Sequence, residues 1–423
     1  MSLATNVETL SYETRQKVSK DLEIKIESKF GNIPPKYIYP FEIKRNDIIL
    51  PFAYAVRVLR LKRKDRGAYP AIKTAFGGTL RPEQKVVKKE ATEALSKTGS
   101  VLLSMFCGFG KSATAMSLAC SIGFKTLVIV NKIVLMKQWE EGILFFCPGA
   151  TVQRVTPQSK KQDCDFYIMN AQNVEKMGSA FFTDVGTVII DEAHLIMAET
   201  LSKSLQHVFP RYLIGLTATP YRPDGLDKLL TLYFGNRKII RELYREHIVQ
   251  KVVTGFKPTI EYAVNGRVNW GIVLDSQAND EWRNQLIVRL LQYYDDRNFL
   301  VMVKRISQGE WLEARLREAG ESVTSLLGSN QEFEQSSRIL IGTSSKIGVG
   351  FDHPRLNALL LATDVEEYFI QYLGRVFRTK EGTPLIVDLV DDYSILTKHW
   401  NTRRKVYQDH GGTVHTFDLA SLD

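Results

Sequence analysis

Short apolar runs bounded by polar turns alternate along the chain with longer stretches in which apolar residues recur at helical spacing. Short runs that are apolar throughout are typical of strands buried on both faces, and the longer stretches are typical of amphipathic helices. The pattern therefore predicts an α/β fold with parallel sheets covered by helices on both sides. In the first half we expect strands over 101–106, 126–130, 166–169, 185–190 and 213–216, and helices over 85–96, 112–120 and 133–146.

The same alternation resumes near residue 282. Expected strands lie over 299–303, 323–327, 338–342, 358–362 and 384–389, and expected helices over 282–294, 310–319, 368–378 and 393–408. Residues 220–280 are rich in Gly, Arg, Lys and Asp and break this rhythm. We therefore expect a first α/β domain over 76–222, a connector with some structure of its own over 223–281 and a second α/β domain over 282–423.

Residues 1–75 have a different pattern and are expected to form a small accessory domain. Within them, 48–61 is apolar and β-branched enough for one or two strands. The basic run 60–66, Arg-Leu-Lys-Arg-Lys-Asp-Arg, then precedes a stretch marked by Gly and Pro. This run suits contact with nucleic acid phosphates and suits a solvated charged face equally well.

Composition narrows the class of protein only slightly. A chain of 423 residues should hold two to three domains, and its net charge of +9 suits a polyanionic partner. The cysteines show neither Cys-x2-Cys spacing nor a neighbouring His, so we expect no zinc site and no disulfide framework, which fits a reducing intracellular compartment. No apolar run approaches 18 residues and the N-terminus is polar, so we expect neither a membrane span nor a signal peptide.

A Gly-rich turn between an expected strand and an expected helix is the first candidate for chemistry. Residues 105–114 read Met-Phe-Cys-Gly-Phe-Gly-Lys-Ser-Ala-Thr. Gly108 and Gly110 allow the backbone to approach phosphates, Lys111 would reach the β- and γ-phosphates, and Ser112 would bind Mg²⁺. The full motif has Gly where this chain has Met105, and the shorter Gly-x-Gly-Lys-Ser can also be an ordinary turn.

Two further strand ends carry polar residues in the first domain. Asp191-Glu-Ala-His194 follows a buried run, where Asp191 can hold Mg²⁺ and Glu192 can deprotonate a water. Without the phosphate loop, the acidic pair Asp191 and Glu192 would be interpreted as a helix cap. Thr217 and Thr219 end the next run, and their hydroxyls could connect a nucleotide site to the sheet, although Thr-Ala-Thr-Pro alone is more often a turn.

The second domain offers an arginine-bearing helix and a hydroxyl-rich loop. Gln371, Arg375 and Arg378 share one helical face, where two arginines could neutralise a transferring γ-phosphate or form a solvated basic stripe. Residues 342–352, Gly-Thr-Ser-Ser-Lys-Ile-Gly-Val-Gly-Phe-Asp, follow a strand and suit contacts to a phosphodiester.

Taken in order, Gln84, Lys111, Asp191-Glu192, Thr217, 343–352 and 371–378 form a series that resembles the superfamily 2 helicases over about residues 78–408. The resemblance implies two RecA-like domains, with ATP in the cleft between them and a nucleic acid strand across both. It implies a catalytic set of Lys111, Asp191, Glu192, Arg375 and Arg378, with the two arginines acting in trans. It also implies Mg²⁺ on Ser112 and Asp191.

The remaining roles follow from the same resemblance. Nucleotide contacts are expected of Arg81, Gln84, Cys107, Gly108, Phe109, Gly110, Lys111, Ser112, Ala113, Gly350 and Asp352, with adenine recognised by the first two. Coupling of hydrolysis to movement is expected of His194, Thr217, Thr219 and Gln371. Nucleic acid contacts are expected of Lys132, Gln138, Trp139, Thr343 and Ser344.

Within the superfamily, three stretches look XPB-like and UvsW-like: 80–84, 106–112 and 216–227. The compact chain with its short N-terminal region looks similar overall to the transcript-release helicases of poxviruses and other large DNA viruses. This implies a monomeric ATP- and Mg²⁺-dependent helicase tracking 3′→5′ on DNA, with RNA polymerase or another transcription factor as a partner. A viral chain of this kind would act in the host cytoplasm or nucleus and could enter the virion. An RNA-directed helicase and a nucleotide-gated clamp without unwinding remain open alternatives.

Overall fold

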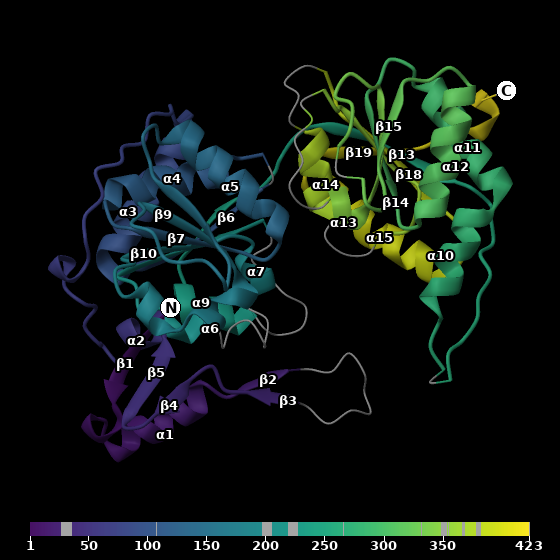
Figure 1. The fold of residues 1–423 in the computed structure, drawn as a ribbon. Coiled ribbons are helices and arrows are strands. Elements are labelled where there is room, and N and C mark those ends of the chain that lie inside the picture. Colours follow the sequence, from purple (N-terminus) through teal and green to yellow (C-terminus); the bar gives the residue numbers. More distant parts are fainter. Residues whose placement is uncertain are drawn as a thin grey trace. The chain divides into compact units, whose positions relative to one another are not determined.

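The computed structural model divides the chain into two compact units, Met1–Glu242 and Leu243–Asp423 (Figure 1). It describes residues 1–26, 36–106, 108–196, 205–218, 227–264, 266–330, 332–347, 353, 355–365, 369–377 and 382–422. Each unit is built on its own parallel sheet, so the predicted α/β class with two RecA-like domains is confirmed. No helix in the described ranges is long and apolar enough to cross a membrane.

Unit 1 contains a seven-stranded parallel sheet in the order β12-β6-β11-β10-β7-β9-β8. Every residue of its five central strands is buried, which explains why the sequence shows them as apolar runs. The strands are β6 (Ser100–Met105), β7 (Thr126–Val130), β8 (Val152–Val155), β9 (Phe166–Asn170), β10 (Thr187–Ile190), β11 (Tyr212–Thr217) and β12 (Lys238–Arg241).

Helices cover both faces of this sheet. On one face α3 packs against α4 and α4 against α5, and on the other α7 packs against α9 (Figure 1). Their bounds are α3 (Pro82–Thr98), α4 (Lys111–Ile122), α5 (Ile133–Phe146), α7 (Ala193–Ile196) and α9 (Asp227–Phe234), with a short α6 (Val174–Met177) before β10.

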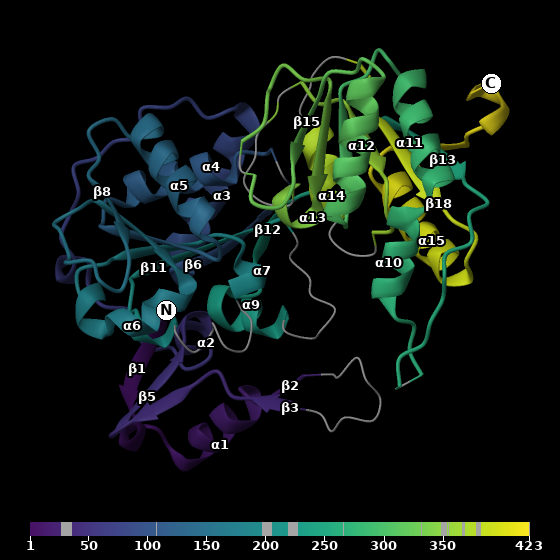
Figure 2. The same cartoon turned by 45° about the vertical axis from the view of Figure 1, so that its right-hand side comes forward.

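The N-terminal region adds a small antiparallel sheet in the order β1-β5-β4. Helix α2 lies between this sheet and α9 (Figures 1 and 2). Leu50 and Phe52 belong to the same apolar cluster as Leu230 and Phe234, so residues 1–75 extend the core of unit 1 and are not a separate domain. The elements are β1 (Ser2–Asn6), α1 (Tyr12–Asp21), β2 (Ile24–Ile26), β3 (Lys36–Ile38), β4 (Glu42–Lys44), β5 (Asp47–Pro51) and α2 (Phe52–Arg57).

One expectation for this region needs correction, and two residues of the basic run have contacts within unit 1. The predicted strands over 48–61 are one strand, β5, followed by helix α2, because Pro51 ends the strand and caps a helix whose buried residues pack on α9. In the basic run, Arg66 donates to Ile122 O at 2.9 Å and lies over the Phe124 ring, and Arg63 donates to Ser96 O at 3.3 Å. These two arginines therefore attach the N-terminal region to unit 1.

The expected connector over 223–281 is also corrected, because its elements belong to the two units. Helix α9 and strand β12 complete unit 1, where β12 pairs with β6. Strand β13 (His247–Val253) lies between β18 and β19 in the second sheet, and α10 (Trp270–Asn279) packs on α11 and α12. The strands that pair with β13 come much later in the chain, so local pattern did not reveal it.

Unit 2 has a seven-stranded parallel sheet in the order β15-β16-β14-β17-β18-β13-β19. Helices α11 and α12 share an apolar cluster with one face of it. The further strands are β14 (Phe299–Val303), β15 (Val323–Leu326), β16 (Ile339–Thr343), β17 (Ala358–Leu361), β18 (Leu385–Val390) and β19 (Gly412–Thr416). The helices are α11 (Glu281–Tyr293), α12 (Ile306–Glu318), α13 (Ser344–Ile347), α14 (Phe369–Val376) and α15 (Ser394–Asp409).

Candidate nucleotide site

The turn between β6 and α4 has the backbone geometry that a phosphate-binding loop requires. Gly108 and Gly110 have φ values of +89° and +88°, in the left-handed region that glycine tolerates. A Cβ on Gly110 would lie 2.2 Å from Nε2 of Gln84, so a larger residue would also displace that amide. Both predicted glycines are therefore needed for this turn, whatever it binds.

Lys111 begins α4 and its side chain folds back over the loop. Its Nζ donates to Met105 O at 3.0 Å and lies 3.5 Å from Phe106 O. Ser112 and Ala113 follow in the first turn of α4, where backbone N–H groups have no partner within the helix. The loop, the ammonium and the helix N-terminus thus supply several donors suited to an anion.

Gln84 and Arg81 connect the start of α3 to this loop. Gln84 Oε1 accepts from the Arg81 N–H at 2.8 Å, and Gln84 Nε2 donates to Phe109 O at 2.8 Å. The Arg81 guanidinium donates to Gly108 O at 3.2 Å and also to Phe109 O. The residues expected to recognise adenine therefore lie directly against the phosphate loop.

Asp191 lies at the carboxyl end of β10 and is buried, with 8% of its surface exposed. Its Oδ2 accepts from Trp139 Nε1 at 2.8 Å, and its Oδ1 accepts from the Glu192 N–H at 3.0 Å. Burial, together with the charge of Glu192, raises the pKa of the Asp191 carboxyl to about 6, while Trp139 and Lys111 act in the opposite direction. Negative charge is therefore concentrated at this strand end.

Glu192 is held in an unusual backbone conformation beside Asp191. Its φ is +47°, in the left-handed region, which costs about 1 kcal/mol for a residue other than glycine. Its Oε2 is buried and accepts no hydrogen bond from the residues that the structure describes. A strained backbone that presents an unsatisfied carboxylate oxygen suits a group that orients a water molecule.

The predicted coupling residues His194 and Thr217 are brought together in unit 1. His194 Nδ1 lies 2.9 Å from Thr217 Oγ1 and 3.5 Å from Glu192 Oε2. Thr217 is the last residue of β11, which pairs with β10. A chain of polar contacts therefore runs from the acidic pair to the end of the neighbouring strand.

Trp139 has a role that sequence reasoning missed. It was expected to contact nucleic acid, but only 3% of its surface is exposed and its indole N–H holds Asp191. Lys132 precedes α5, two residues after β7 ends, and Gln138 lies in the second turn of α5; both residues are partly exposed. The residue type gave no sign of this role, because tryptophan offers a stacking face and an N–H donor equally.

In unit 2, Thr343 ends β16 and Ser344 begins α13, whereas Arg375 lies on α14 and is 9% exposed. Tyr372 of α14 approaches Ser344 O at 3.5 Å, so the two predicted motifs of this unit are neighbours. Helix α14 is described as far as Val376, two residues short of Arg378. The predicted residues outside the described ranges are Cys107, Thr219, Gly350, Asp352 and Arg378, as is the side chain of Gln371.

A buried polar cluster fixes the chain ahead of α14, and sequence reasoning missed this too. Arg403 of α15 donates to Asp364 Oδ1 at 2.8 Å and to Val365 O at 2.9 Å, and His399 Nδ1 lies 2.6 Å from Asp364 Oδ2. Arg403 also makes two bonds of 2.8 Å to Asp388. No local pattern reveals these contacts, since α15 follows α14 with β18 between them.

The oxygen atoms near the loop fit Mg²⁺. Ser112 supplies a hydroxyl and Asp191 a carboxylate, and Mg²⁺ is usually held by one or two such groups with phosphate and water. The unsatisfied Glu192 oxygen and the raised pKa of Asp191 are both signs of uncompensated negative charge. Among the described residues, no group of three or more His, Cys, Asp or Glu side chains is placed so that it could hold a metal ion.

Two RecA-like units, one carrying a phosphate loop beside a buried acidic pair, define a nucleotide-hydrolysing motor class. Comparison with known proteins agrees. The family described as "Type III restriction enzyme, res subunit" matches residues 78–222. The chain is 41% identical to Putative helicase 161L of invertebrate iridescent virus 6, over 99% of this chain and 100% of that protein.

Two more distant matches also cover most of the chain. Putative ATP-dependent RNA helicase L396 of Acanthamoeba polyphaga mimivirus is 25% identical over 98% of this chain and 85% of its own length. The structure of S. cerevisiae Dbp5 bound to RNA and ADP BeF3 superposes with a TM-score of 0.57 at 14% identity, covering 81% of this chain and 95% of Dbp5. This chain belongs to the viral group of superfamily 2 helicases, and it is an ATP-hydrolysing enzyme.

The raised pKa of Asp191 predicts a pH-dependent cost to stability. Since the pKa rises from 3.8 to about 6 on folding, the ionised form is penalised, and the penalty grows from about pH 4 until it is complete above about pH 7. Converted into free energy of unfolding, this difference between the two pKa values corresponds to an upper limit of about 3 kcal/mol. The stability of Asp191→Asn relative to wild type should therefore rise with pH over this range.

Denaturation of both proteins between pH 5 and pH 8, in EDTA and without nucleotide, measures this difference. Asparagine cannot accept one of the hydrogen bonds that Asp191 accepts. This loss changes the free energy of unfolding of the variant by an amount that does not vary with pH. A pH-independent difference for Asp191→Asn would contradict the prediction.

Trp139→Phe should impair the metal site while leaving the fold intact. Loss of the indole donor frees Asp191 Oδ2, and removing a partner of a metal ligand typically costs 10- to 100-fold in metal affinity or activity. The Mg²⁺ concentration for half-maximal ATPase should rise accordingly. Trp400→Phe removes another buried indole, in unit 2, and should leave that concentration unchanged.

Proposed function

We propose that this enzyme is a Mg²⁺-dependent DNA helicase or translocase in which ATP hydrolysis drives movement along a nucleic acid strand. The observation that carries the proposal is the convergence, within unit 1, of the phosphate loop and the buried acidic pair. Trp139, Asp191 and Lys111 join α5, β10 and α4 at one edge of the sheet. A site at the carboxyl edge of a parallel sheet is where nucleotides bind in such folds.

Different side chains of the candidate site can perform different parts of the hydrolysis reaction. Lys111 exchanges its present carbonyl partners for phosphate oxygens, which are stronger acceptors because they are charged. Glu192 orients the attacking water and takes up its proton through Oε2. Ser112 and Asp191 would hold Mg²⁺, which would offset charge on the phosphates when bound.

Movement requires that ATP binding and hydrolysis change the conformation of parts of the enzyme away from the nucleotide site. The contacts from Glu192 through His194 to Thr217 offer a route, since Thr217 begins the segment that leads out of β11. In unit 2, Arg375 supplies the positive charge that stabilises the transition state, and the Arg403 cluster keeps the segment before α14 in place. Alternating grip on the strand would then follow the nucleotide cycle.

DNA is the proposed substrate because the motifs at 80–84, 106–112 and 216–227 resemble the XPB-like and UvsW-like branch. The same resemblance supports 3′→5′ tracking by a monomer and release of transcripts, with RNA polymerase or another transcription factor as partner. RNA is the second candidate, favoured by the name of the mimivirus relative, an ATP-dependent RNA helicase, and by the RNA bound in the Dbp5 structure.

Steady-state ATPase assays without nucleic acid and with single-stranded DNA, double-stranded DNA or RNA, each at two salt concentrations, test the proposal. Salt-sensitive stimulation by DNA supports it, because grip on the phosphate backbone weakens steeply with salt. Stimulation by RNA alone overturns the substrate and keeps the mechanism. Strand displacement measured beside ATPase separates a helicase from a nucleotide-gated clamp.

Lys111→Ala and Glu192→Gln should each abolish nucleic-acid-stimulated ATPase. The first removes the ammonium above the loop, and the second removes the base while keeping the side chain's size. Lys137→Ala changes an exposed lysine of α5 and should retain wild-type turnover. Full activity in either site variant would refute the assignment of this site.

Arg375→Ala should leave ATP binding intact and slow hydrolysis by about 10³-fold, the lower range for a transition-state arginine. Binding is measured with a fluorescent nucleotide and hydrolysis in a single turnover. Arg315→Ala, which removes an exposed ion pair with Glu318 in the same unit, is the control and should change neither. A hydrolysis rate within a few-fold of wild type would exclude this role for Arg375.

A further inference from the structure

Two cysteines that lie far apart in the sequence meet in unit 1. Cys120 Sγ on α4 lies 3.5 Å from Cys147 Sγ, just beyond the end of α5. We propose that Cys120 and Cys147 form an oxidisable thiol pair, which a peroxide converts into a reversible disulfide between these two helices. The inference does not depend on the proposed function, because neither sulfur takes part in the nucleotide site.

The positions of both sulfurs are set by packed helices. Helices α4 and α5 contact each other, and the Cys147 N–H donates to Ile143 O at 2.8 Å, which continues the hydrogen bonding of α5. A disulfide bond is about 2.0 Å long, so the sulfurs need to approach by about 1.5 Å.

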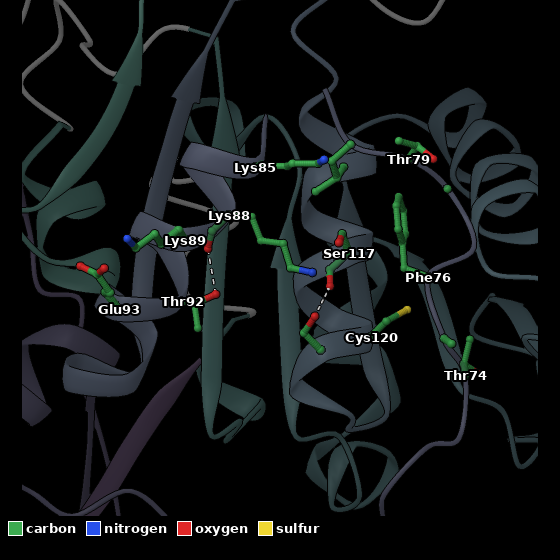
Figure 3. A pocket seen from close by; sticks show the side chains of 14 residues that line it. Thr74, Phe76, Thr79, Lys85, Lys88, Lys89, Thr92, Glu93, Ser117 and Cys120 are labelled. Carbon is green, nitrogen blue, oxygen red and sulfur yellow. Dashed lines mark hydrogen bonds between the residues drawn. The ribbon is translucent and has the colours of Figure 1, made fainter. Parts of the chain in front are cut away.

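A groove gives the oxidant access to one of the two sulfurs. The groove has a volume of about 930 Å³ and lies between α3, α4 and the segment that precedes α3 (Figure 3). Cys120 lines it and is partly exposed, whereas Cys147 is fully buried. The hydrogen bond to Cys147 and burial raise the pKa of the Cys120 thiol, and Lys88, which extends from α3 across the groove towards α4, opposes this rise only in part. A small peroxide can thus reach the pair from solvent.

The reaction is balanced with a peroxide as the oxidant. One thiol loses its proton, and its sulfur attacks a peroxide oxygen, which forms a sulfenic acid and releases hydroxide. The second sulfur then attacks the sulfenic sulfur, the S–S bond forms and water leaves. The hydrogen bond from Cys120 lowers the pKa of the Cys147 thiol, which suits it to this second step. Overall, two thiols and one hydrogen peroxide give one disulfide and two waters.

Cys164 provides an internal comparison. It is also a buried free cysteine of unit 1, but among the described residues it has no sulfur neighbour. Since proximity speeds the second step, Cys164 should not pair in the folded protein. Selective bonding of Cys120 to Cys147 therefore distinguishes this geometry from general oxidation of exposed thiols.

The test is to treat the full-length folded protein with hydrogen peroxide, block remaining thiols and map disulfide-linked peptides by mass spectrometry. The expected product is one intramolecular Cys120–Cys147 bond, with a loss of two hydrogens that dithiothreitol reverses. Because the bond joins residues 27 apart, the oxidised protein should also show a higher Tm than the reduced protein.

Three variants complete the design. Cys164→Ser should form the bond as wild type does, whereas Cys120→Ser and Cys147→Ala should form none and show no Tm shift. Cys120→Ser lies at a partly exposed position, so it keeps the test valid if Cys147→Ala fails to fold. Retention of all thiols, bonds that involve Cys107 or Cys164, or oxidation of Cys120 beyond the sulfenic acid without pairing would overturn the proposal.

Discussion

The buried charge of Asp191 is the constraint on which the arrangement of unit 1 depends. A carboxylate with little access to water must be held by donors or offset by a cation. Trp139 and the Glu192 N–H supply the donors, and Lys111 supplies the nearby positive charge. These groups come from α5, β10 and α4, so the three elements must keep their relative positions for the charge to be tolerated.

Function and stability oppose each other at this site. The raised pKa of Asp191 and the left-handed backbone of Glu192 both cost free energy in the folded protein. The surrounding sheet can absorb that cost, because every residue of its five central strands is buried. Strain retained beside a phosphate loop is what a hydrolytic site would need, since it keeps a carboxylate ready for water and metal.

In unit 2, buried positive charges are likewise held in place by partners. Arg403, nearly fully buried, is paired with Asp364 and Asp388, and Arg283 Nε is paired with Asp391 at 2.9 Å. Both arginines also donate to backbone carbonyls near the end of β17, Arg403 to Val365 O and Arg283 to Ala362 O. Buried ion pairs of this kind contribute little net stability but fix one geometry. Here they fix the segment that leads into the arginine-bearing helix.

The sequence by itself determined the elements whose pattern is local. The strand expected over 126–130 coincides with β7, and the helix over 133–146 with α5, because runs buried on both faces and helical periodicity are visible without knowing the partner. The turn glycines and the residues at the strand ends were predictable for the same reason. Their chemistry depends on residue type and on position relative to one strand.

Only the tertiary structure decided what depends on partners distant in the chain. It placed β13 between β18 and the edge strand β19, and it merged residues 1–75 with the core of unit 1. It turned Trp139 inward onto Asp191 and brought Cys120 to Cys147. Residue type and spacing do not predict these contacts, because a side chain's direction and its distant neighbours are set by how whole elements pack.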